Sequence, residues 1–75
     1  MESHDLLHEF PEHREKILTL QKGSNRFRKL QEEYQAADNQ IHRIETGTEA
    51  TTDEHLNELR MKRVHLKDSL YHFLV

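Results

Sequence analysis

The stretch FRKLQEEYQAADNQIHRI, residues 27–44, decides the fold because its apolar side chains recur every three or four positions. An α-helix has about 3.6 residues per turn, so this spacing collects the apolar side chains into one stripe along the helix. The stripe consists of Phe27, Leu30, Tyr34, Ala37, Ile41 and Ile44. A narrow stripe of this kind is typical of a helix that packs against another helix, so we expect such a partner.

A second stripe with the same spacing follows after a short polar stretch. It consists of Leu56, Leu59, Arg63, Leu66, Leu70 and Phe73. Because the connection between the two stripes is so short, the two helices must run antiparallel. We therefore predict an all-α fold, an antiparallel helical hairpin of the coiled-coil type, as a single domain over residues 1–75.

The ends of these helices are marked by residues that suit helix caps. Gly47 follows the first stripe, where a helix ends most easily with a residue in the left-handed conformation. Thr51 or Thr52 can cap the next helix with its hydroxyl group. These signals predict a first helix over about 12–46, a loop over 47–52 and a second helix over about 53–74.

The start of the first helix is less clear. Residues 4–9 can form a short turn, and Pro11 suits the first position of a new helix. Gly23-Ser24-Asn25 is either a C-cap followed by a new N-cap at Ser24 or a weak point within one helix. The apolar rhythm continues through this point, at Ile17, Leu20, Ser24 and Phe27. This continuity favours a long or kinked first helix over a break.

Arg63 is the one charged residue in an otherwise apolar stripe. If Ile44 faces Leu56, the antiparallel register sets Arg63 opposite Ala37 and beside Asp38. A guanidinium group at such a position needs an acidic partner, and its aliphatic stem can cover apolar surface. We therefore predict a buried ion pair between Asp38 and Arg63.

Several apolar residues before Phe27 have no partner within a two-helix hairpin, because the second helix ends beside Phe27. They are Leu6, Leu7, Phe10, Ile17, Leu18 and Leu20. Val64, Tyr71 and Leu74 likewise extend the apolar surface of the second helix beyond its stripe. Either the first segment folds back as a third helix, or a second subunit covers it. We predict that these six residues form an interaction surface, that the chain is a homodimer in a four-helix arrangement, and that it binds an unknown protein partner.

The composition narrows the class of protein. The chain has 75 residues and no cysteine, and a chain this small often needs a partner to bury enough apolar surface. Its 11 basic and 14 acidic residues are interleaved, so nucleic acid is an unfavoured ligand. We see neither a stretch of about 20 apolar residues that would cross a membrane nor a secretory signal, and we expect a cytoplasmic protein with no membrane contact.

Seven histidines make a metal- or proton-responsive function the leading alternative. His4 and His8 are four positions apart, so a helix would place both imidazoles on one face. No third ligand is evident from the sequence, so this pair is a weak metal candidate. We expect no cofactor.

Catalysis is not expected, because a bare helical hairpin offers no cleft in which two carboxylates could acquire different pKa values. A basic cluster on the second helix supports weak nucleic-acid binding as a second alternative. It consists of Arg60, Lys62, Arg63 and Lys67. The proposed register places Glu33 opposite Lys67, so we favour ion pairing on a solvated flank for these charges.

Taken together, these residues resemble a known family, the YdcH-like small bacterial proteins, whose function is not established. The resemblance covers nearly the whole chain. It rests on His8-Glu9-Phe10-Pro11-Glu12, on Phe27, Leu30 and Tyr34, on Ile41-His42-Arg43-Ile44-Glu45, and on Arg63-Val64-His65-Leu66-Lys67-Asp68. The resemblance implies a cytoplasmic, all-helical hairpin and no catalytic residues. Ala36-Ala37 departs from the larger apolar residue common there, which leaves room for Arg63.

The function predicted from the sequence is therefore that of a self-associating protein-binding module, an adaptor or a regulator, and not an enzyme.

Overall fold

The computed structural model describes residues 6–75, and every regular element in this range is a helix. In chain order these are α1 (Leu6–Glu9), the short 3-10 helix η1 (Pro11–His13), α2 (Arg14–Gly23), α3 (Asn25–Glu45) and α4 (Asp53–Leu74). The predicted all-α fold class is confirmed.

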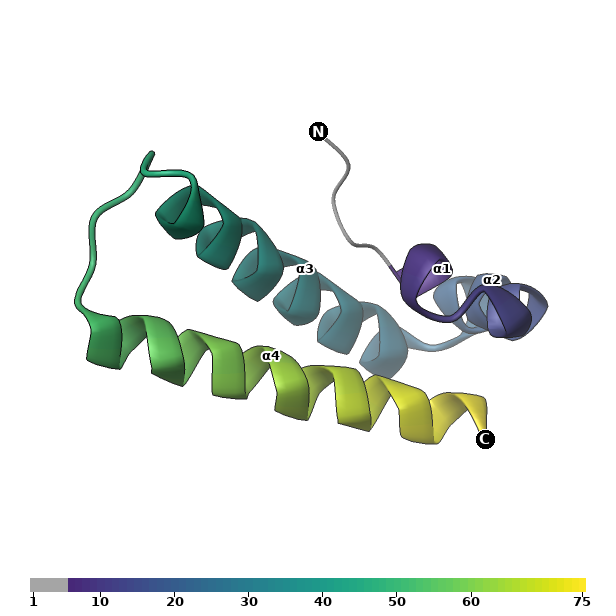
Figure 1. The fold of residues 1–75 in the computed structure, drawn as a ribbon. Coiled ribbons are helices and arrows are strands. Elements are labelled where there is room, and N and C mark those ends of the chain that lie inside the picture. Colours follow the sequence, from purple (N-terminus) through teal and green to yellow (C-terminus); the bar gives the residue numbers. More distant parts are fainter. Residues whose placement is uncertain (1–5) are drawn as a thin grey trace.

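The helices α3 and α4 lie side by side and run in opposite directions (Figure 1). Their register brings Phe27 near the start of α3 against Phe73 near the end of α4, with ring centroids 5.4 Å apart in an edge-to-face arrangement. Phe27, Tyr34 and Ile41 are buried along one side of α3. The stripe of residues 27–44 is therefore the inner side of the pair.

The connection between α3 and α4 is shaped by Gly47, which has a φ of 82° and so occupies the left-handed region that favours glycine. Beyond it, the amides of Thr48 and Glu49 both donate to the carbonyl of Arg43. The Glu49 carboxylate accepts hydrogen bonds from Arg43 and Gln40, and these bonds lower the pKa of Glu49. The loop is thus fastened back onto the end of α3.

The helix α4 begins with a hydroxyl cap. Thr52 adopts extended dihedral angles, and its Oγ1 accepts a hydrogen bond of 3.1 Å from the amide of His55. Asp53 and Glu54 follow in the first turn, where negative charge is favourable because of the helix dipole. Of the two threonines considered above, Thr52 provides the cap.

The prediction of one long or kinked helix over about 12–46 is wrong, because the chain breaks at Ser24. Ser24 has φ −129° and ψ 110°, which is extended, and its Oγ accepts a 3.1 Å hydrogen bond from the amide of Phe27. This cap replaces a backbone acceptor at the start of α3 and allows α2 to leave the α3 axis (Figure 1). The break is what lets the chain fold back.

Residues 6–23, called the N-terminal segment below, turn back and complete the core of the hairpin. Leu6, Phe10 and Ile17 are buried in one apolar cluster with residues of both long helices. The other buried members of this cluster are Phe27, Tyr34, Ala37, Leu66, Leu70 and Leu74. Burying a large apolar side chain contributes about 1.5–3 kcal/mol, so three such residues bind the segment firmly to the hairpin.

Candidate interaction surface

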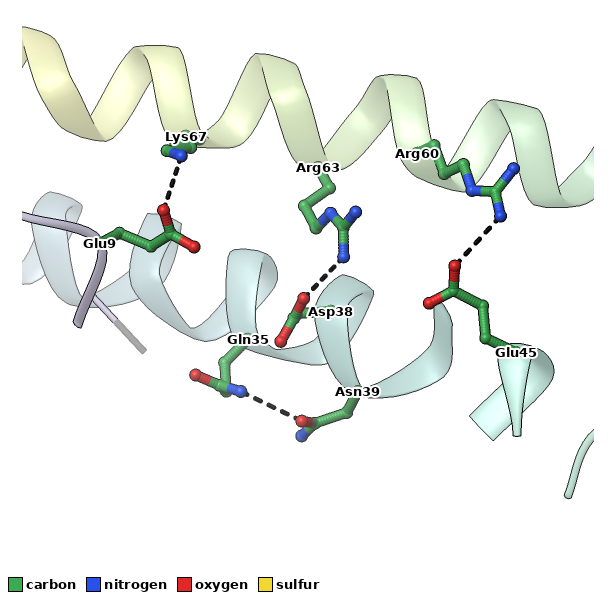
Figure 2. Close-up of polar contacts among 8 residues, drawn as sticks. All are labelled: Glu9, Gln35, Asp38, Asn39, Glu45, Arg60, Arg63 and Lys67. Atoms are coloured by element: carbon green, nitrogen blue, oxygen red, sulfur yellow. Dashed lines mark hydrogen bonds and ion pairs between the residues drawn. The ribbon is translucent and has the colours of Figure 1, made fainter. Parts of the chain in front are cut away.

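A row of ion pairs runs along one side of α4 and joins it to α3 and to the N-terminal segment (Figure 2). The nitrogen–oxygen distances are 2.7 Å for Glu9 and Lys67, 2.7 Å for Asp38 and Arg63, and 3.1 Å for Glu45 and Arg60. We call this row the polar seam. Each cation in this row is matched with a carboxylate, so the polar seam joins α4 to α3 and to the N-terminal segment.

The predicted pair of Asp38 and Arg63 is at the middle of the polar seam (Figure 2). The Asp38 side chain is 7% exposed, whereas that of Arg63 is 32% exposed, so only the carboxylate is truly buried. Ala37 is buried beside them and is small, as the register required. A buried carboxylate without its partner would be strongly unfavourable, so separating Asp38 from Arg63 would destabilise the hairpin.

Tyr34 lies next to this pair and is buried in the cluster shared by the hairpin and the N-terminal segment. Burial, reinforced by the negative charges of Glu9 and Asp38 and opposed by Arg63, raises the pKa of Tyr34 to about 12. The hydroxyl group therefore stays neutral at physiological pH. Tyr34 is suited to packing and hydrogen bonding, and not to accepting protons.

The pair of Glu9 and Lys67 ties the N-terminal segment to α4 and corrects the expectation that Lys67 faces Glu33. Lys67 Nζ also lies 5.6 Å from the centroid of the Phe10 ring, within the range of a cation–π contact. The Phe10 ring in turn lies 5.5 Å from the ring of Tyr71. The segment is therefore held to α4 by one ion pair and by aromatic contacts.

The six residues predicted as an interaction surface are mostly used inside the chain, so that prediction is wrong as a description of an exposed face. Leu6, Phe10 and Ile17 are buried, and Leu7 and Leu20 are partly buried against the same cluster. Leu18 alone of the six is exposed, at 37%. The break at Ser24 explains this outcome, since it turns α2 back toward the hairpin.

Apart from Leu18 on α2, the large apolar side chains that remain exposed in residues 6–75 lie on α4 and at Val75 just after it, and helical spacing sets them away from the inner stripe of α4. Met61 and Val64 are each 60% exposed, Tyr71 is 41% exposed and Val75 at the end of the chain is 68% exposed. With two polar positions they form a stripe that advances by four and three residues in turn. This stripe, which we call the outer face of α4, consists of Asn57, Met61, Val64, Asp68, Tyr71 and Val75.

The sequence carried a partial signal for the outer face. Val64 and Tyr71 stood out as apolar residues beyond the inner stripe of the second helix, but Leu74, grouped with them, is buried in the core. Asp68 interrupts the outer face in the same way as Arg63 interrupts the inner stripe, which hides its periodicity. Unlike Arg63, Asp68 makes no ion pair or side-chain hydrogen bond with residues 6–75.

A hollow of about 450 Å³ opens on the surface of α4 beside the N-terminal segment. Phe10, Val64 and Tyr71 provide its apolar lining, and Lys67 and Asp68 stand among its polar lining residues. The outer face therefore has an open hollow at its border with the N-terminal segment.

The described residues do not build a metal site around the predicted pair of His4 and His8. His4 lies outside the described residues, and His8 is exposed on α1. Within residues 6–75 no group of three or more His, Cys, Asp or Glu side chains is arranged to hold a metal ion. No helix in the same range combines the length and the apolar character needed to cross a membrane.

Comparison with known proteins finds a family but no individual relative. No curated protein and no solved structure matches the chain. A family model described as a protein of unknown function, DUF465, matches residues 27–74, which include almost all of α3, the connection and α4. The N-terminal segment lies outside the matched residues. The chain therefore belongs to the DUF465 family of proteins of unknown function, which is the family of YdcH-like small proteins.

Proposed function

We propose that this protein is a non-catalytic protein-binding module that forms a homodimer through the outer face of α4. The observation that carries the proposal is the exposed apolar stripe on α4. Exposed apolar residues scattered singly are ordinary, but a stripe with the spacing of a helix-packing seam is a feature of helices that bind other helices. We propose the cytoplasm as the location of this module, an expectation that rests on the resemblance to YdcH-like proteins.

A second copy of the chain is the partner that the outer face fits. Its spacing repeats that of the inner stripe, which already pairs two helices within one chain. An antiparallel pairing of two outer faces that matches all the positions sets Met61 against Tyr71 of the second copy. The two hairpins would then form the four-helix arrangement.

Asp68 limits the strength of this dimer. In the same register Asp68 faces Val64 of the second copy, so its carboxylate loses water without gaining a basic partner at that position. The stripe is also narrower than a standard protein interface. We therefore expect a reversible dimer with a dissociation constant on the order of 100 µM, which suits an adaptor or regulator that exchanges partners.

We expect no catalysis, because the charged groups of the polar seam that lie close together are used in ion pairs. The polar seam matches each carboxylate with a cation, and the raised pKa of Tyr34 keeps its hydroxyl group protonated. These features support a structural role for the seam.

The test is sedimentation equilibrium over a wide range of protein concentration, on the wild type and on two matched variants. Val64→Glu places a charge in the outer face, whereas Leu18→Glu places one at an exposed apolar position on α2. We expect the average mass of the wild type and of Leu18→Glu to rise with concentration and that of Val64→Glu to stay monomeric. Asp68→Leu should bind more tightly than the wild type.

Far-UV circular dichroism of each variant checks that its helices are intact. A wild type that stays monomeric at millimolar concentration, or a Val64→Glu variant that dimerises like the wild type, would overturn the proposal.

A further inference from the structure

We propose that the N-terminal segment exchanges between two copies of the chain by straightening at Ser24. In the closed form, which the structure shows, residues 6–23 cover their own hairpin. In the exchanged form, α2 and α3 join into one helix, and the segment covers the hairpin of the second copy. The exchanging segment meets the outer face of α4 at the contact between Phe10 and Tyr71, but the inference does not depend on dimerisation through that face.

The backbone at Ser24 is close to helical on both sides. The amide of Ser24 donates to the carbonyl of Leu20 at 2.9 Å, and the amide of Arg28 donates to the carbonyl of Ser24 at 3.1 Å. Both are the four-residue bonds of an α-helix. The helical ladder is therefore interrupted only over one turn.

The groups left over at this interruption are held by side chains. The amide of Phe27 donates to Ser24 Oγ, and the carbonyl of Gln21 accepts a 3.2 Å bond from Arg28 Nη1. If Ser24 took helical dihedral angles, the amides of residues 25–27 would instead donate to the carbonyls of residues 21–23. Straightening thus exchanges two side-chain bonds for a short run of backbone bonds, and the Phe27 amide and the Gln21 carbonyl have partners in both states.

The glycine before the hinge has room for a side chain. Gly23 lies at the end of α2, and a Cβ atom placed there would meet no heavy atom within 4 Å. The three- and four-residue spacing also runs through the hinge, at Ile17, Leu20, Ser24 and Phe27, and Ser24 is its one polar position. A continuous helix would therefore carry a single apolar stripe from α2 into α3.

The straight form cannot satisfy this stripe within one chain. Phe73, near the end of α4, lies beside Phe27, so α4 ends where α2 would extend onward. A straightened α2 of 10 residues would project about 15 Å beyond the hairpin. At the same time the hairpin would lose the cover that Leu6, Phe10 and Ile17 give it.

A second straightened copy supplies what each chain has lost. Its N-terminal segment carries the same side chains and can make the same contacts, which include the ion pair between Glu9 and Lys67 and the hydrogen bond of 3.1 Å between Gln21 and Gln31. The exchanged dimer and two closed monomers therefore have almost the same contacts. The balance between them depends on the hinge and on the protein concentration.

The first experiment changes the hinge alone. Gly23→Ala with Ser24→Ala removes the cap and favours a continuous helix, whereas Gly23→Ala with Ser24→Asp keeps a capping side chain and is the matched control. Both are made together with Val64→Glu, so that the outer face of α4 cannot contribute. We expect the association constant of the Ser24→Ala protein to exceed that of its control by at least about tenfold.

The second experiment shows whether the segment has changed partners. In the Ser24→Ala background, one protein carries Glu9→Lys and the other carries Lys67→Glu. Each closed monomer then contains two like charges at this site, but a dimer of one chain with the other restores an opposite pair at both sites if the segments are exchanged. We expect the mixed dimer to exceed its statistical half of all dimers, as measured by native mass spectrometry.

Two results would overturn the exchange. One is mixed dimers at the statistical proportion only, since a dimer with both segments in place gains nothing from mixing. The other is the absence of any dimer in the Ser24→Ala proteins at several hundred micromolar while circular dichroism shows intact helices. If these variants fail to fold, the Val64→Glu protein refolded from urea at high concentration replaces them, and failure to trap any dimer there overturns the proposal as well.

Discussion

The α3–α4 hairpin is made of two helices of 21 and 22 residues that contact each other along most of their length, whereas the longest helix of the N-terminal segment has 10 residues. The family model matches residues 27–74, the hairpin, and not the segment. Each long helix of the hairpin can satisfy most of its apolar stripe with the other. The segment has no such internal partner, so its order depends on burying Leu6, Phe10 and Ile17 in the hairpin.

The largest change in the free energy of unfolding is expected from a residue of the N-terminal segment that is buried in the hairpin. Ile17 is fully buried, while its neighbour Leu18 on the same helix is 37% exposed. We expect Ile17→Ala to lower the free energy of unfolding by about 3 kcal/mol, because it leaves a cavity in the shared core, and Leu18→Ala to lower it by less than about 0.5 kcal/mol. Urea denaturation measures both. Equal effects from the two variants would mean that the segment does not dock as described.

Tyr34 provides a second, smaller test of the boundary between the two regions. Its pKa is raised from the usual 10 to about 12, first by burial and then by Glu9 of the segment and Asp38 of the hairpin. The folded state therefore holds the tyrosine proton more tightly than the unfolded chain. The free energy of unfolding is therefore unaffected by this group below pH 10, and it falls as the pH rises from 10 to about 12.

The loss should reach about 2.7 kcal/mol at most, measured as the free energy of unfolding in urea at several pH values. Tyr34→Phe is the control, since it lacks the titrating group. Other groups titrate in this range as well, so the difference between the two proteins is the quantity to compare. A difference that does not change with pH would show that Tyr34 is not buried where the two regions meet.

Two ion pairs of the polar seam differ in burial, and their coupling energies can be compared. In a double-mutant cycle with alanine, we expect a coupling of about 1 kcal/mol between Asp38 and Arg63, because the carboxylate is buried. The pair of Glu45 and Arg60 has both side chains nearly half exposed, so its coupling should be below about 0.5 kcal/mol. A reversed order would contradict the conclusion that the hairpin depends more on the pair of Asp38 and Arg63.

An effect of similar size is expected at the start of α4. Thr52→Ala removes the hydroxyl group that caps α4 and should lower the free energy of unfolding by about 1 kcal/mol. Thr51→Ala, one residue earlier in the chain, should change it by only a few tenths of that amount. Thermal unfolding followed by circular dichroism distinguishes them, and a larger effect from Thr51→Ala would place the cap elsewhere.

The sequence predicts the hairpin well because each of its features is decided within a few residues or by one short connection. The spacing of the two stripes defines which sides face each other, and Gly47 marks where α3 stops. Asp38 and Arg63 are brought together by the same register, since a charge within an apolar stripe needs a nearby partner.

The position of the N-terminal segment could not be predicted in the same way. Apolar spacing shows that a helix has a face to cover, but it does not say what covers it. At Ser24 a side-chain cap and a continuous helix are both compatible with the local residues, and it is the burial of Ile17 in the fold that selects the break. The pairing of Lys67 with Glu9 joins residues 58 positions apart, beyond the reach of helical spacing.

The sequence predicts the outer face of α4 only in part, for a related reason. Val64 and Tyr71 are visible as apolar residues outside the inner stripe, but the sequence alone does not tell which of the apolar residues near the end of α4 remain exposed. Leu74 is covered by the fold and Val64 is not. Which of these residues is exposed depends on where the N-terminal segment docks, and it passes beside Tyr71.

The most direct test of the account is whether the N-terminal segment packs on α4 in a single chain. The rings of Phe10 and Tyr71 are 5.5 Å apart between centroids, and they join the two regions. Nuclear Overhauser effects between these ring protons can be measured in a dilute sample that sedimentation shows to be monomeric. The account predicts clear cross-peaks and a Phe10 ring shifted from its random-coil position, whereas absent cross-peaks with random-coil shifts for Phe10 would contradict it.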